Sequence, residues 1–420
     1  MYFERTEIQN FKGIEKMKLE FSSGVNLLIG NNGVGKTTVL EALALSMQNY
    51  FNRMNGITKK SIKKNDVYFT SNLVGDASQH RVYSNPTVIK SKINLDGVEY
   101  SSEISREDET STTRTKYAGK EFAAAGRDIL NSQEAILPVI CYFSTSRVVD
   151  TQKVSTSAIG KNKLNDRRCG YIDCMNATLD RKALTDWAFK MAMVEYKKGA
   201  SVAEYEAFKK AVIFMQKMND LNEVPLVEYT RDFEDITYTE NGKTMLVNYL
   251  SAGYQSLLWM LMEISFRIAL LNPEMSDYSQ AEGIVLIDEI DMHLHPRWQW
   301  KILDALHSSF PKVQFIAATH SPIIISSFKD AKLLSIGENG VEELSGAYAY
   351  SIDDVVEYKQ GSFGIPQELR QLKQEFEDAF CLRDRENSQK AVDKMKELFG
   401  TSNTEVKRAE AKMQMRKKWS

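Results

Sequence analysis

Val25-Asn-Leu-Leu-Ile29 is followed without a break by Gly30-Asn-Asn-Gly-Val-Gly-Lys36-Thr37, and this stretch decides the fold. The first five residues are mostly apolar and predict a short buried strand. The next eight fit the pattern G-x-x-x-x-G-K-[ST] of a phosphate-binding loop. From Thr38 onward, apolar residues recur at helical spacing as far as Met47. The order of strand, glycine loop and helix is the context that this motif requires.

The residue types in the loop fit the binding of a nucleotide phosphate. Glycines let the backbone curl so that its N–H groups point inward, and the helix N-terminus adds partial positive charge. Lys36 is placed to reach the β- and γ-phosphates, and the Thr37 hydroxyl is placed to ligate Mg²⁺. The predicted nucleotide-binding residues here are Gly30, Asn31, Asn32, Gly33, Val34, Gly35, Lys36, Thr37 and Thr38.

Composition indicates an ordinary globular protein with room for two or three domains, or for one domain with a large insertion. The 420 residues are 43% hydrophobic and 26% charged, and the formal net charge is −2. Contact with nucleic acid would therefore need a local basic patch. No apolar run is long enough to span a bilayer, and the charged N-terminus does not resemble a secretory signal. The four cysteines have neither disulfide nor zinc spacing, which predicts reduced thiols in a cytoplasm.

Several segments before residue 150 have recognisable patterns. Residues 1–29 predict two or three strands, and Lys12 in this region is either a phosphate contact or a solvated lysine. Strands around Asp96-Gly97 predict a hairpin, and residues 101–120, rich in Ser, Thr and charge, predict a mobile loop. Lysines cluster at 59–64, as either a nucleic-acid contact or a solvated basic face.

The middle of the chain alternates between strand and helix patterns. Residues 137–143 predict a buried strand that ends in Ser144-Thr-Ser-Arg147, which is either a site-lining loop or a surface turn. Residues 152–170 predict a polar linker or lid, and residues 174–222 predict helices. Residues 225–248 return to strand character with a hairpin tip near Asn241.

A second group of chemically informative residues begins at Leu250-Ser-Ala-Gly-Tyr-Gln255. Ser251 is a suitable helix N-cap, and Gly253 permits close approach of another group. Further on, Gly283-Ile-Val-Leu-Ile predicts a buried strand that ends in Asp288 and Glu289. Asp288 fits a Mg²⁺ ligand acting through bound water, and Glu289 fits the base that polarises the attacking water.

Of the four histidines that follow this acidic pair, three lie in informative patterns. The His293-Leu-His295 pattern lacks a third metal ligand, so a structural joint between loop and helix is favoured over a metal site. His320 ends another buried strand, at 315–319, beside the strand of Asp288. A histidine in that position can donate to a γ-phosphate and sense its loss.

Together, the phosphate loop, Leu-Ser-Ala-Gly-Tyr-Gln, Ile-Asp-Glu and Thr-His-Ser-Pro resemble the ATP-binding cassette (ABC) ATPases, and more narrowly their SMC- and RecF-like branch. The resemblance implies that Ser251 and Gly253 bind the γ-phosphate of ATP held on a second subunit, in a head-to-tail dimer around two ATPs. It makes His320 the switch histidine and places Asp291 in the loop that communicates across the interface. Ala252-Gly253-Tyr254 departs from the usual Gly-Gly-Gln, and the glutamine that joins the two lobes has no identified counterpart.

The residues after His320 lack the acidic clusters of a TOPRIM nuclease and any His-Asn-His pattern, and they end in a basic helical tail. This layout resembles the PtuA-type ATPase subunits of Septu and retron anti-phage systems. Septu ATPases of this type work beside a separate HNH nuclease, and this resemblance implies such a partner here.

The predicted fold class is α/β: an ABC-type ATPase head, with a mixed sheet around the phosphate loop, a helical insertion and a helical C-terminal tail. The predicted segments are an N-terminal lobe at 1–150, an insertion or lid at 151–225, a C-terminal lobe at 226–335, and a tail for partner or oligomer contacts at 336–420.

The predicted function is that of an ATP- and Mg²⁺-dependent ATPase that dimerises and regulates a partner nuclease in anti-phage defence. Two alternatives stay open at this point. One is a DNA-repair or DNA-binding ATPase without a nuclease partner, which would use the basic tail and the lysines at 59–64. The other is a scaffold that binds nucleotide with little turnover.

Overall fold

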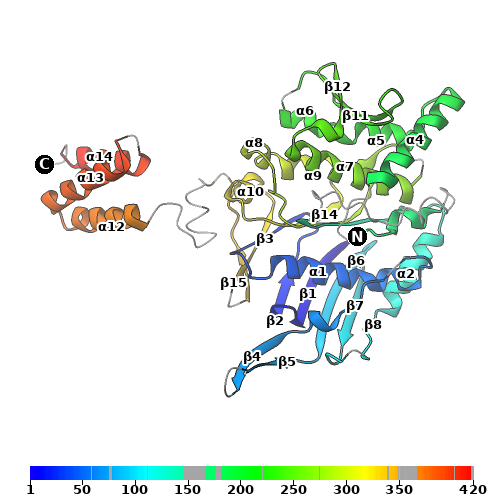
Figure 1. Ribbon diagram of the computed structural model, residues 1–420, viewed down its shortest axis with the longest axis horizontal. Coiled ribbons are helices and arrows are strands. Elements are labelled where there is room, and N and C mark those ends of the chain that lie inside the picture. Colours follow the sequence, from blue (N-terminus) through cyan, green and yellow to red (C-terminus); the bar gives the residue numbers. More distant parts are fainter. Residues whose placement is uncertain are drawn as a thin grey trace. The chain divides into compact units, whose positions relative to one another are not determined.

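The computed structural model describes residues 1–57, 59–74, 78–110, 112–145, 166–175, 181–219, 221–273, 275–337, 340–348, 350, 355, 367–401 and 403–417. The chain forms two compact units, Met1–Val355 and Val356–Ser420. The first contains the phosphate loop, and the second contains the three C-terminal helices (Figure 1). Within the described ranges, no helix is both long and apolar enough to cross a membrane.

A five-stranded antiparallel sheet lies at the N-terminal end of the first unit. Its order is β2-β1-β6-β7-β8, with β1 at Tyr2–Phe11, β2 at Ile14–Glu20, β6 at Thr87–Leu95, β7 at Val98–Arg106 and β8 at Lys116–Ala118. The predicted hairpin between β6 and β7 is confirmed, with Asp96 and Gly97 both at positive φ. A separate two-stranded hairpin joins β4 (Phe69–Val74) to β5 (Ser78–Tyr83).

The prediction of a mobile loop at 101–120 is wrong. Within this range, β7 continues to Arg106, β8 follows, and α2 begins at Lys120 and runs to Asn131. Ser102, Ile104 and Arg106 are buried at alternate positions, as in a half-buried strand. The Ser102 hydroxyl donates to the Ser46 carbonyl at 2.7 Å, so a polar side chain is accommodated in the core by a partner that local composition does not reveal.

The second sheet has six strands and carries the phosphate loop. Its order is β16-β15-β3-β14-β13-β9, and its strands are β3 (Val25–Ile29), β9 (Val139–Phe143), β13 (Gly283–Ile287), β14 (Val313–Ala318), β15 (Lys332–Gly337) and β16 (Gly340–Leu344). Strands β15, β3, β14, β13 and β9 run parallel to one another, and β16 at the edge is antiparallel to β15. Every residue of β3, β9, β13 and β14 is buried, as expected for central strands covered on both faces.

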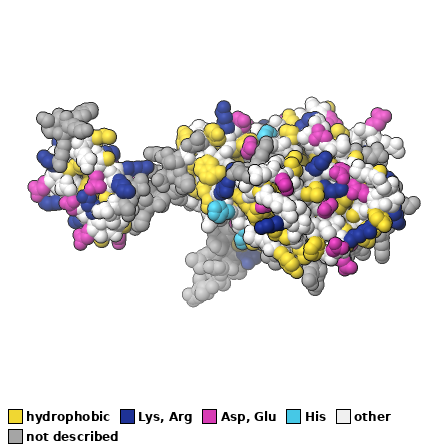
Figure 2. Space-filling model, turned by 90° about the horizontal axis from the view of Figure 1, so that it is seen from above, with side chains coloured by type: hydrophobic (Ala, Val, Ile, Leu, Met, Phe, Trp, Pro, Cys, Tyr) yellow, Lys and Arg dark blue, Asp and Glu magenta, His cyan; other side chains and the backbone are white. Residues whose placement is uncertain are grey.

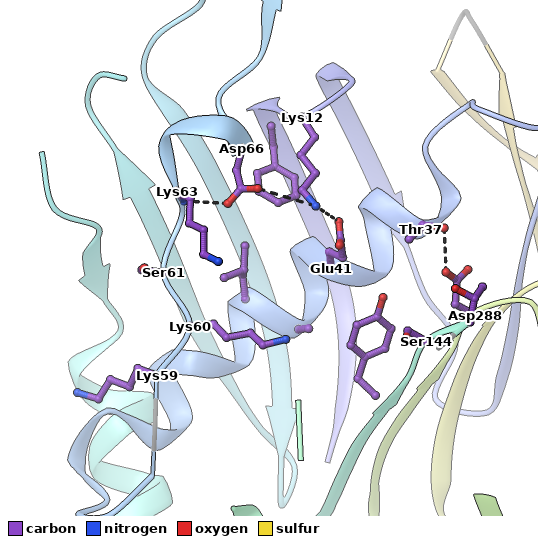
Figure 3. Close-up of a pocket in the computed structure, with 15 residues that line it drawn as sticks. Lys12, Thr37, Glu41, Lys59, Lys60, Ser61, Lys63, Asp66, Ser144 and Asp288 are labelled. Carbon is purple, nitrogen blue, oxygen red and sulfur yellow. Dashed lines mark hydrogen bonds and ion pairs between the residues drawn. The ribbon is translucent and has the colours of Figure 1, made fainter. Parts of the chain in front are cut away.

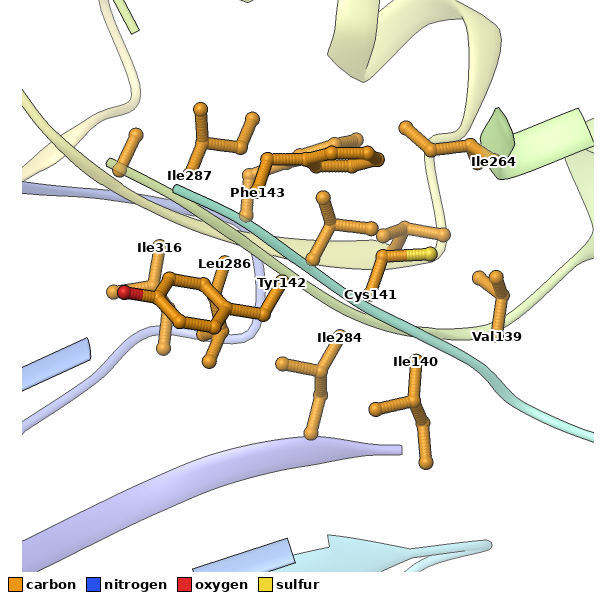
Figure 4. Packing of buried hydrophobic residues seen from close by; sticks show 14 of the residues in the cluster. Val139, Ile140, Cys141, Tyr142, Phe143, Ile264, Ile284, Leu286, Ile287 and Ile316 are labelled. Carbon is orange, nitrogen blue, oxygen red and sulfur yellow. The ribbon is translucent and has the colours of Figure 1, made fainter. Parts of the chain in front are cut away.

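Helices cover both faces of this sheet. Helix α1 (Lys36–Ser46) contacts β13 and β14 of the six-stranded sheet and β1, β6 and β7 of the antiparallel sheet, so it lies between the two sheets. Helix α7 (Ala252–Leu271) contacts β9 from the other side. Alternate residues of β9 accordingly point to opposite faces, with Cys141 and Phe143 on the side of Ile264 in α7 (Figure 4).

The described residues between β9 and α7 form a cap of helices and a small sheet. The helices are α4 (Arg181–Lys198), α5 (Ala203–Lys209) and α6 (Phe214–Asn219), and the strands are β10 (Leu226–Thr230), β11 (Asp235–Glu240) and β12 (Lys243–Leu246). The predicted helices and strands in this region are therefore confirmed. After β13 come α8 (Pro296–Gln299), α9 (Ile302–Ser309) and α10 (Pro322–Ser327).

The second unit contains α12 (Gln367–Cys381), α13 (Arg385–Phe399) and α14 (Thr404–Lys417). These helices enclose a core of their own, made of Leu369, Leu372, Phe376, Ala391, Val392, Met395, Val406 and Ala409. The predicted start of the tail, at residue 336, lies inside β15, and the first unit continues to Val355.

Gln314 on β14 connects the two sheets of the first unit. Its side chain is fully buried, with Oε1 accepting from the Phe3 N–H at 2.8 Å and Nε2 donating to the Phe3 carbonyl at 2.9 Å. Nε2 also donates to the Ser22 carbonyl at 2.6 Å. The Gln314 amide thus supplies hydrogen-bond partners for both backbone groups of Phe3 on β1, where the antiparallel sheet contacts β14.

We expect Gln314→Leu to lower the free energy of unfolding by roughly 1–3 kcal/mol, because it leaves the buried N–H and C=O of Phe3 without partners. Chemical denaturation followed by circular dichroism measures this loss. Gln9→Leu, which makes the same change at an exposed position on β1, is the matched control. Equal stability of the two variants would contradict this assignment.

Candidate nucleotide-binding site

The loop between β3 and α1 has the backbone shape that a phosphate cradle requires. Gly30, Gly33 and Gly35 all have positive φ, at 140°, 82° and 102°. Gly35 is also the N-cap of α1. A Cβ on Gly30 would lie 2.3 Å from the carbonyl oxygen of Ile336 on β15, so no larger residue fits there without moving that strand. Asn31, Asn32 and Gly33 are exposed at the tip of the loop, while Val34 and Thr38 are half-buried.

Lys36 is only 6% exposed, and its ammonium group donates to the carbonyls of Gly30 and Asn31, each at 2.9 Å. Burial lowers the pKa of Lys36, and the negative charges of Asp288, Glu289 and Asp291 oppose that shift. The loop carbonyls and these three carboxylates thus hold the cation at the start of α1. Phosphate oxygens, which are stronger acceptors, can replace the two carbonyls.

Thr37 and Asp288 are distant in sequence but meet in the fold. The Thr37 hydroxyl donates to Oδ2 of Asp288 at 2.9 Å, and Asp288 is only 2% exposed (Figure 3). Asp288 is placed by the sheet, because its N–H donates to the Phe143 carbonyl at 2.8 Å just after β13 and β9 end in register. The two residues predicted to hold Mg²⁺ therefore face each other across the carboxyl edge of the parallel strands.

The segment Asp288–His295, called the acidic loop below, turns sharply after β13. Glu289 has φ +46° and His293 has φ +64°, both in the left-handed region that residues with side chains rarely occupy. Asp291 accepts a hydrogen bond from the Thr319 hydroxyl at 2.6 Å. This bond ties the loop to the end of β14 and so to the backbone next to His320. Strain of this kind is typical of functional loops.

His320 follows β14, which pairs with the strand of Asp288 as the sequence predicted. Burial and the charge of Lys36 lower the pKa of His320, while Asp291, Glu289 and Asp288 act in the opposite direction. The imidazole is therefore neutral near pH 7. A neutral imidazole can donate one hydrogen bond and accept another.

His295 has a structural role at the end of the acidic loop. His295 is the N-cap of α8, where its Nδ1 accepts from the Arg297 N–H at 3.2 Å, and Pro296 occupies the first turn. His293 is exposed. The described residues hold no group of three or more His, Cys, Asp or Glu that could bind a metal ion. The interpretation of this segment as a structural joint is supported.

The segment Ser251–Gln255, called the signature segment below, begins α7. Ser251 occupies the N-cap position but makes no capping hydrogen bond through its side chain, and both Ser251 and Ala252 are exposed. Gln255 holds the turn by donating to the carbonyls of Asn248 and Leu250. No hydrogen bond between described residues joins Ser251 or Gly253 to the phosphate loop of the same chain.

A pocket of about 660 Å³ adjoins Thr37 and Asp288 (Figure 3). It lies between α1, the β1–β2 turn, residues 59–66 and the end of β9. The Lys12 ammonium pairs with Glu41 of α1 and lies 3.8 Å from Asp66, so Lys12 is half-buried and paired with carboxylates within the chain. Ser144 and Thr145 line the pocket, which favours the site-lining interpretation of their segment; Ser146 and Arg147 lie outside the described residues.

Sequence reasoning missed two other residues of this pocket, Glu41 and Tyr142. Glu41 lies one helical turn after Thr37, so the periodicity of α1 could have placed it on the same side. Tyr142 belongs to the apolar run at 137–143, and such a run predicts only that the strand is buried. The predicted lid at 152–170 is described only from residue 166.

Two of the four clustered lysines at 59–64 are engaged within the chain. Lys60 donates to the Met175 carbonyl, and burial lowers the pKa of its ammonium group. Lys59 donates to the carbonyl and side-chain oxygens of Asn52. Lys60 is thereby held against the backbone of Met175, while Lys59 stays exposed beside Asn52, so Lys60 in particular is less available to a basic surface.

A parallel sheet with a phosphate loop after β3 and an acidic pair after β13 defines a P-loop ATPase. A family model described as an AAA domain matches residues 5–237, and a second, described as "AAA domain, putative AbiEii toxin, Type IV TA system", matches residues 211–326. The chain belongs to the first of these AAA domain families. It is an ATPase whose sequence is similar to those of Septu PtuA and retron ATPases.

Two relatives support this placement. The "Retron Vc95 probable ATPase" of Vibrio cholerae serotype O1 biovar El Tor is 24% identical over 79% of this chain and 72% of its own length. The "Septu protein PtuA" of Bacillus mycoides (strain KBAB4) is 24% identical over 98% of this chain, which spans about half of that relative, at 53%. A crystal structure of an SMC head bound to the C-winged helix domain of ScpA covers 82% of this chain and 98% of its own, at 16% identity and a TM-score of 0.50, and shows the fold.

The lowered pKa of His320 predicts a pH dependence of stability. The unfolded chain takes up a proton at this side chain near its ordinary pKa of about 6.5, while the folded protein resists protonation until a lower pH. Its contribution to stability is therefore fully present above pH ~6.5 and is lost as the pH falls through the folded pKa. We expect the melting temperature of the wild type to fall more steeply below pH 6.5 than that of His320→Gln.

Thermal melts in a series of buffers from pH 8 to pH 5 measure this difference. His293→Asn is the control, because it replaces an exposed histidine with a residue that tolerates positive φ. Parallel slopes for the wild type and His320→Gln would show that the pKa of His320 is not lowered in the folded protein.

Proposed function

We propose that this ATPase closes into a head-to-tail homodimer around two ATP molecules and thereby regulates a partner nuclease in anti-phage defence. The observation that carries the ATPase part is the Thr37–Asp288 contact, which joins the phosphate loop to the acidic strand end. The defence role is supported by relatives named for Septu and retron systems. The separate HNH-type nuclease follows from the resemblance to Septu ATPases.

The residues present fit a magnesium ion. A threonine hydroxyl and a carboxylate are hard oxygen donors, and Mg²⁺ in nucleotide sites takes few protein ligands together with phosphate oxygens and water. The 2.9 Å hydrogen bond between Thr37 and Asp288 holds both oxygens at one place. When bound there, Mg²⁺ would neutralise charge on the β- and γ-phosphates. We propose Thr37 and Asp288 as its protein ligands.

The remaining catalytic roles are proposed from position. Residues Gly30 to Thr38 would bind the phosphates through backbone N–H groups and the Lys36 ammonium. Glu289 would accept a proton from the attacking water, because it follows Asp288 at the same edge and its charge acts on both Lys36 and His320. The neutral imidazole of His320 would donate to the γ-phosphate.

Completion of the site by a second chain is supported by the exposure of the signature segment. Ser251 lies at an uncapped, exposed helix N-terminus, which favours an anion. Since no hydrogen bond between described residues ties Ser251 to the phosphate loop of its own chain, we propose that Ser251 and Gly253 bind the γ-phosphate held on the partner subunit. Asp291 would then lie in the loop that reports across this interface.

We propose a separate role for each of the predicted segments. Residues 1–150 and 226–335 would form the two ATPase lobes, with 151–225 as an insertion. The C-terminal helices would bind the partner, since they enclose a core separate from that of the ATPase unit. An independently packed unit can change partner contacts without disturbing the ATP site.

A DNA-binding ATPase without a nuclease partner is less well supported. Lys59 and Lys60 are engaged by Asn52 and Met175, and on the C-terminal helices Arg408 pairs with Glu405, and Lys412 with Glu377. On the face of the ATPase unit seen in Figure 2, basic and acidic side chains alternate rather than gather in a patch. A nucleotide-binding scaffold with little turnover would also leave the acidic pair at the carboxyl edge without a use.

We expect Glu289→Gln to lower ATP turnover by roughly 100-fold or more, because a general base contributes at least that factor, while nucleotide binding is retained. The variant should elute as a dimer in gel filtration with ATP and Mg²⁺, since hydrolysis no longer reopens it. Turnover is measured by phosphate release.

Glu342→Gln, an exposed change on β16, is the matched control and should behave like the wild type. A Glu289→Gln variant that stays monomeric with ATP, or that retains normal turnover, would contradict the proposed mechanism.

A pull-down of the tagged protein from its host, with ATP present and mass spectrometry as the readout, tests the proposed partner. Recovery of an HNH-type protein would support a nuclease partner, and recovery of nucleic acid alone would favour the DNA-binding alternative.

A further inference from the structure

The signature segment touches the acidic loop within a single chain. A Cβ on Gly253 would lie 2.5 Å from the carbonyl oxygen of His293, which is too close for any side chain. The absence of a side chain at Gly253 is therefore already required by packing inside one protomer. The start of α7 and the turn of the acidic loop are in direct backbone contact.

Two aromatic rings extend this contact. The ring of Tyr254, which follows Gly253, packs edge-on against Trp298 with centroids 4.3 Å apart and an interplanar angle of 75°. Trp298 belongs to α8, which starts where the acidic loop ends and is capped by His295. Such edge-to-face pairs are favoured by the charge distribution of the rings. The same two segments are thus held at a second point.

Asn219, the last residue of α6, bridges the polar atoms of both rings. Its Nδ2 donates to the Tyr254 hydroxyl at 2.8 Å, and its Oδ1 accepts from Nε1 of Trp298 at 2.9 Å. The indole N–H can only donate, so the amide has a single orientation that satisfies both contacts. Asn219 belongs to no recognisable motif, yet its side chain connects the signature segment to α8, the helix that follows the acidic loop.

Glu240 of β11 completes the cluster. Its carboxylate accepts from the Tyr238 hydroxyl at 2.7 Å and from the Tyr254 hydroxyl at 3.3 Å. Burial and this carboxylate raise the pKa of Tyr254 to about 12, so the phenol keeps the proton that it donates. Tyr254 can accept from Asn219 and donate to Glu240 at the same time, which fixes its ring in the cluster.

We propose that Asn219 is a positioning residue that holds the signature segment and the acidic loop of one protomer together as a rigid unit. This inference rests on the proposed dimer. There, the signature segment acts on ATP held by the partner, while the acidic loop acts on ATP held by its own chain. A rigid link between them makes the geometry of one site depend on the occupancy of the other. Turnover at the two sites is therefore coupled through the cap formed by α6 and β11.

Asn219→Leu tests this role, because leucine has a similar size but makes neither hydrogen bond. We expect kcat to fall roughly tenfold, as for the loss of one or two buried hydrogen bonds, and the Hill coefficient for ATP to fall toward one. The affinity for a fluorescent ATP analogue should change less than about twofold, because the phosphate loop is untouched. Asn222→Leu, an exposed asparagine three residues later, is the matched control for the substitution.

Tyr254→Phe provides a second variant that removes only a hydroxyl. If Asn219 acts through Tyr254, the loss of kcat in the double variant should be smaller than the product of the two single losses, because the shared hydrogen bond is lost only once and only the contact of Tyr254 with Glu240 is lost in addition. Multiplicative losses would show that the two residues act independently and would overturn the proposal. A melting temperature of each variant close to that of the wild type excludes simple unfolding as the cause.

The possible failures are distinguishable. If Glu289→Gln forms an ATP-dependent dimer while Asn219→Leu matches Asn222→Leu in kcat and Hill coefficient, the coupling role of Asn219 is wrong and the proposed dimer stands. If Glu289→Gln stays monomeric with ATP, the dimer is wrong, and the coupling role is overturned with it.

Discussion

The hydrogen bond between Thr37 and Asp288 is the contact on which the rest of the site depends. It forms only if β3 and β13 end at the same edge of a parallel sheet, with β14 between them to supply His320. That arrangement requires strands buried on both faces, and the fully buried, mostly apolar runs of β3, β13 and β14 meet this requirement. Helix α1 then fills the space between the two sheets and carries Lys36 and Thr37 to the edge.

The second constraint is the contact between the start of α7 and the acidic loop. The Gly253–His293 approach and the Tyr254–Trp298 pair leave the signature segment little freedom relative to Asp291. Asn219 adds the cap of helices and strands to the same unit. In the proposed dimer, a partner that moves this cap would change the signature segment, which offers a physical route from partner binding to ATP turnover.

The sequence predicts those parts of the fold that local pattern determines. The glycine loop, the buried strands and the hairpin at Asp96-Gly97 follow from spacing and residue type, and the structure has each of them. Contacts between distant residues could not be predicted this way. Gly30 is needed because Ile336 lies against it, and the polar strand β7 is stabilised by a partner on α1. Asn219 belongs to no motif, and only the fold brings it between Tyr254 and Trp298.

Mixing two inactive variants tests the central claim, that each ATP site is completed by a second chain. Lys36→Ala disables the phosphate loop, and Ser251→Arg disables the signature segment. In a symmetric dimer that exchanges subunits, half of the molecules are mixed, and each of these keeps one intact composite site, so equimolar mixing should restore turnover to at most about a quarter of the wild-type value, and to less if the disabled site slows the intact one. If each variant is inactive alone and the mixture stays inactive as well, Ser251 does not complete the site of another chain.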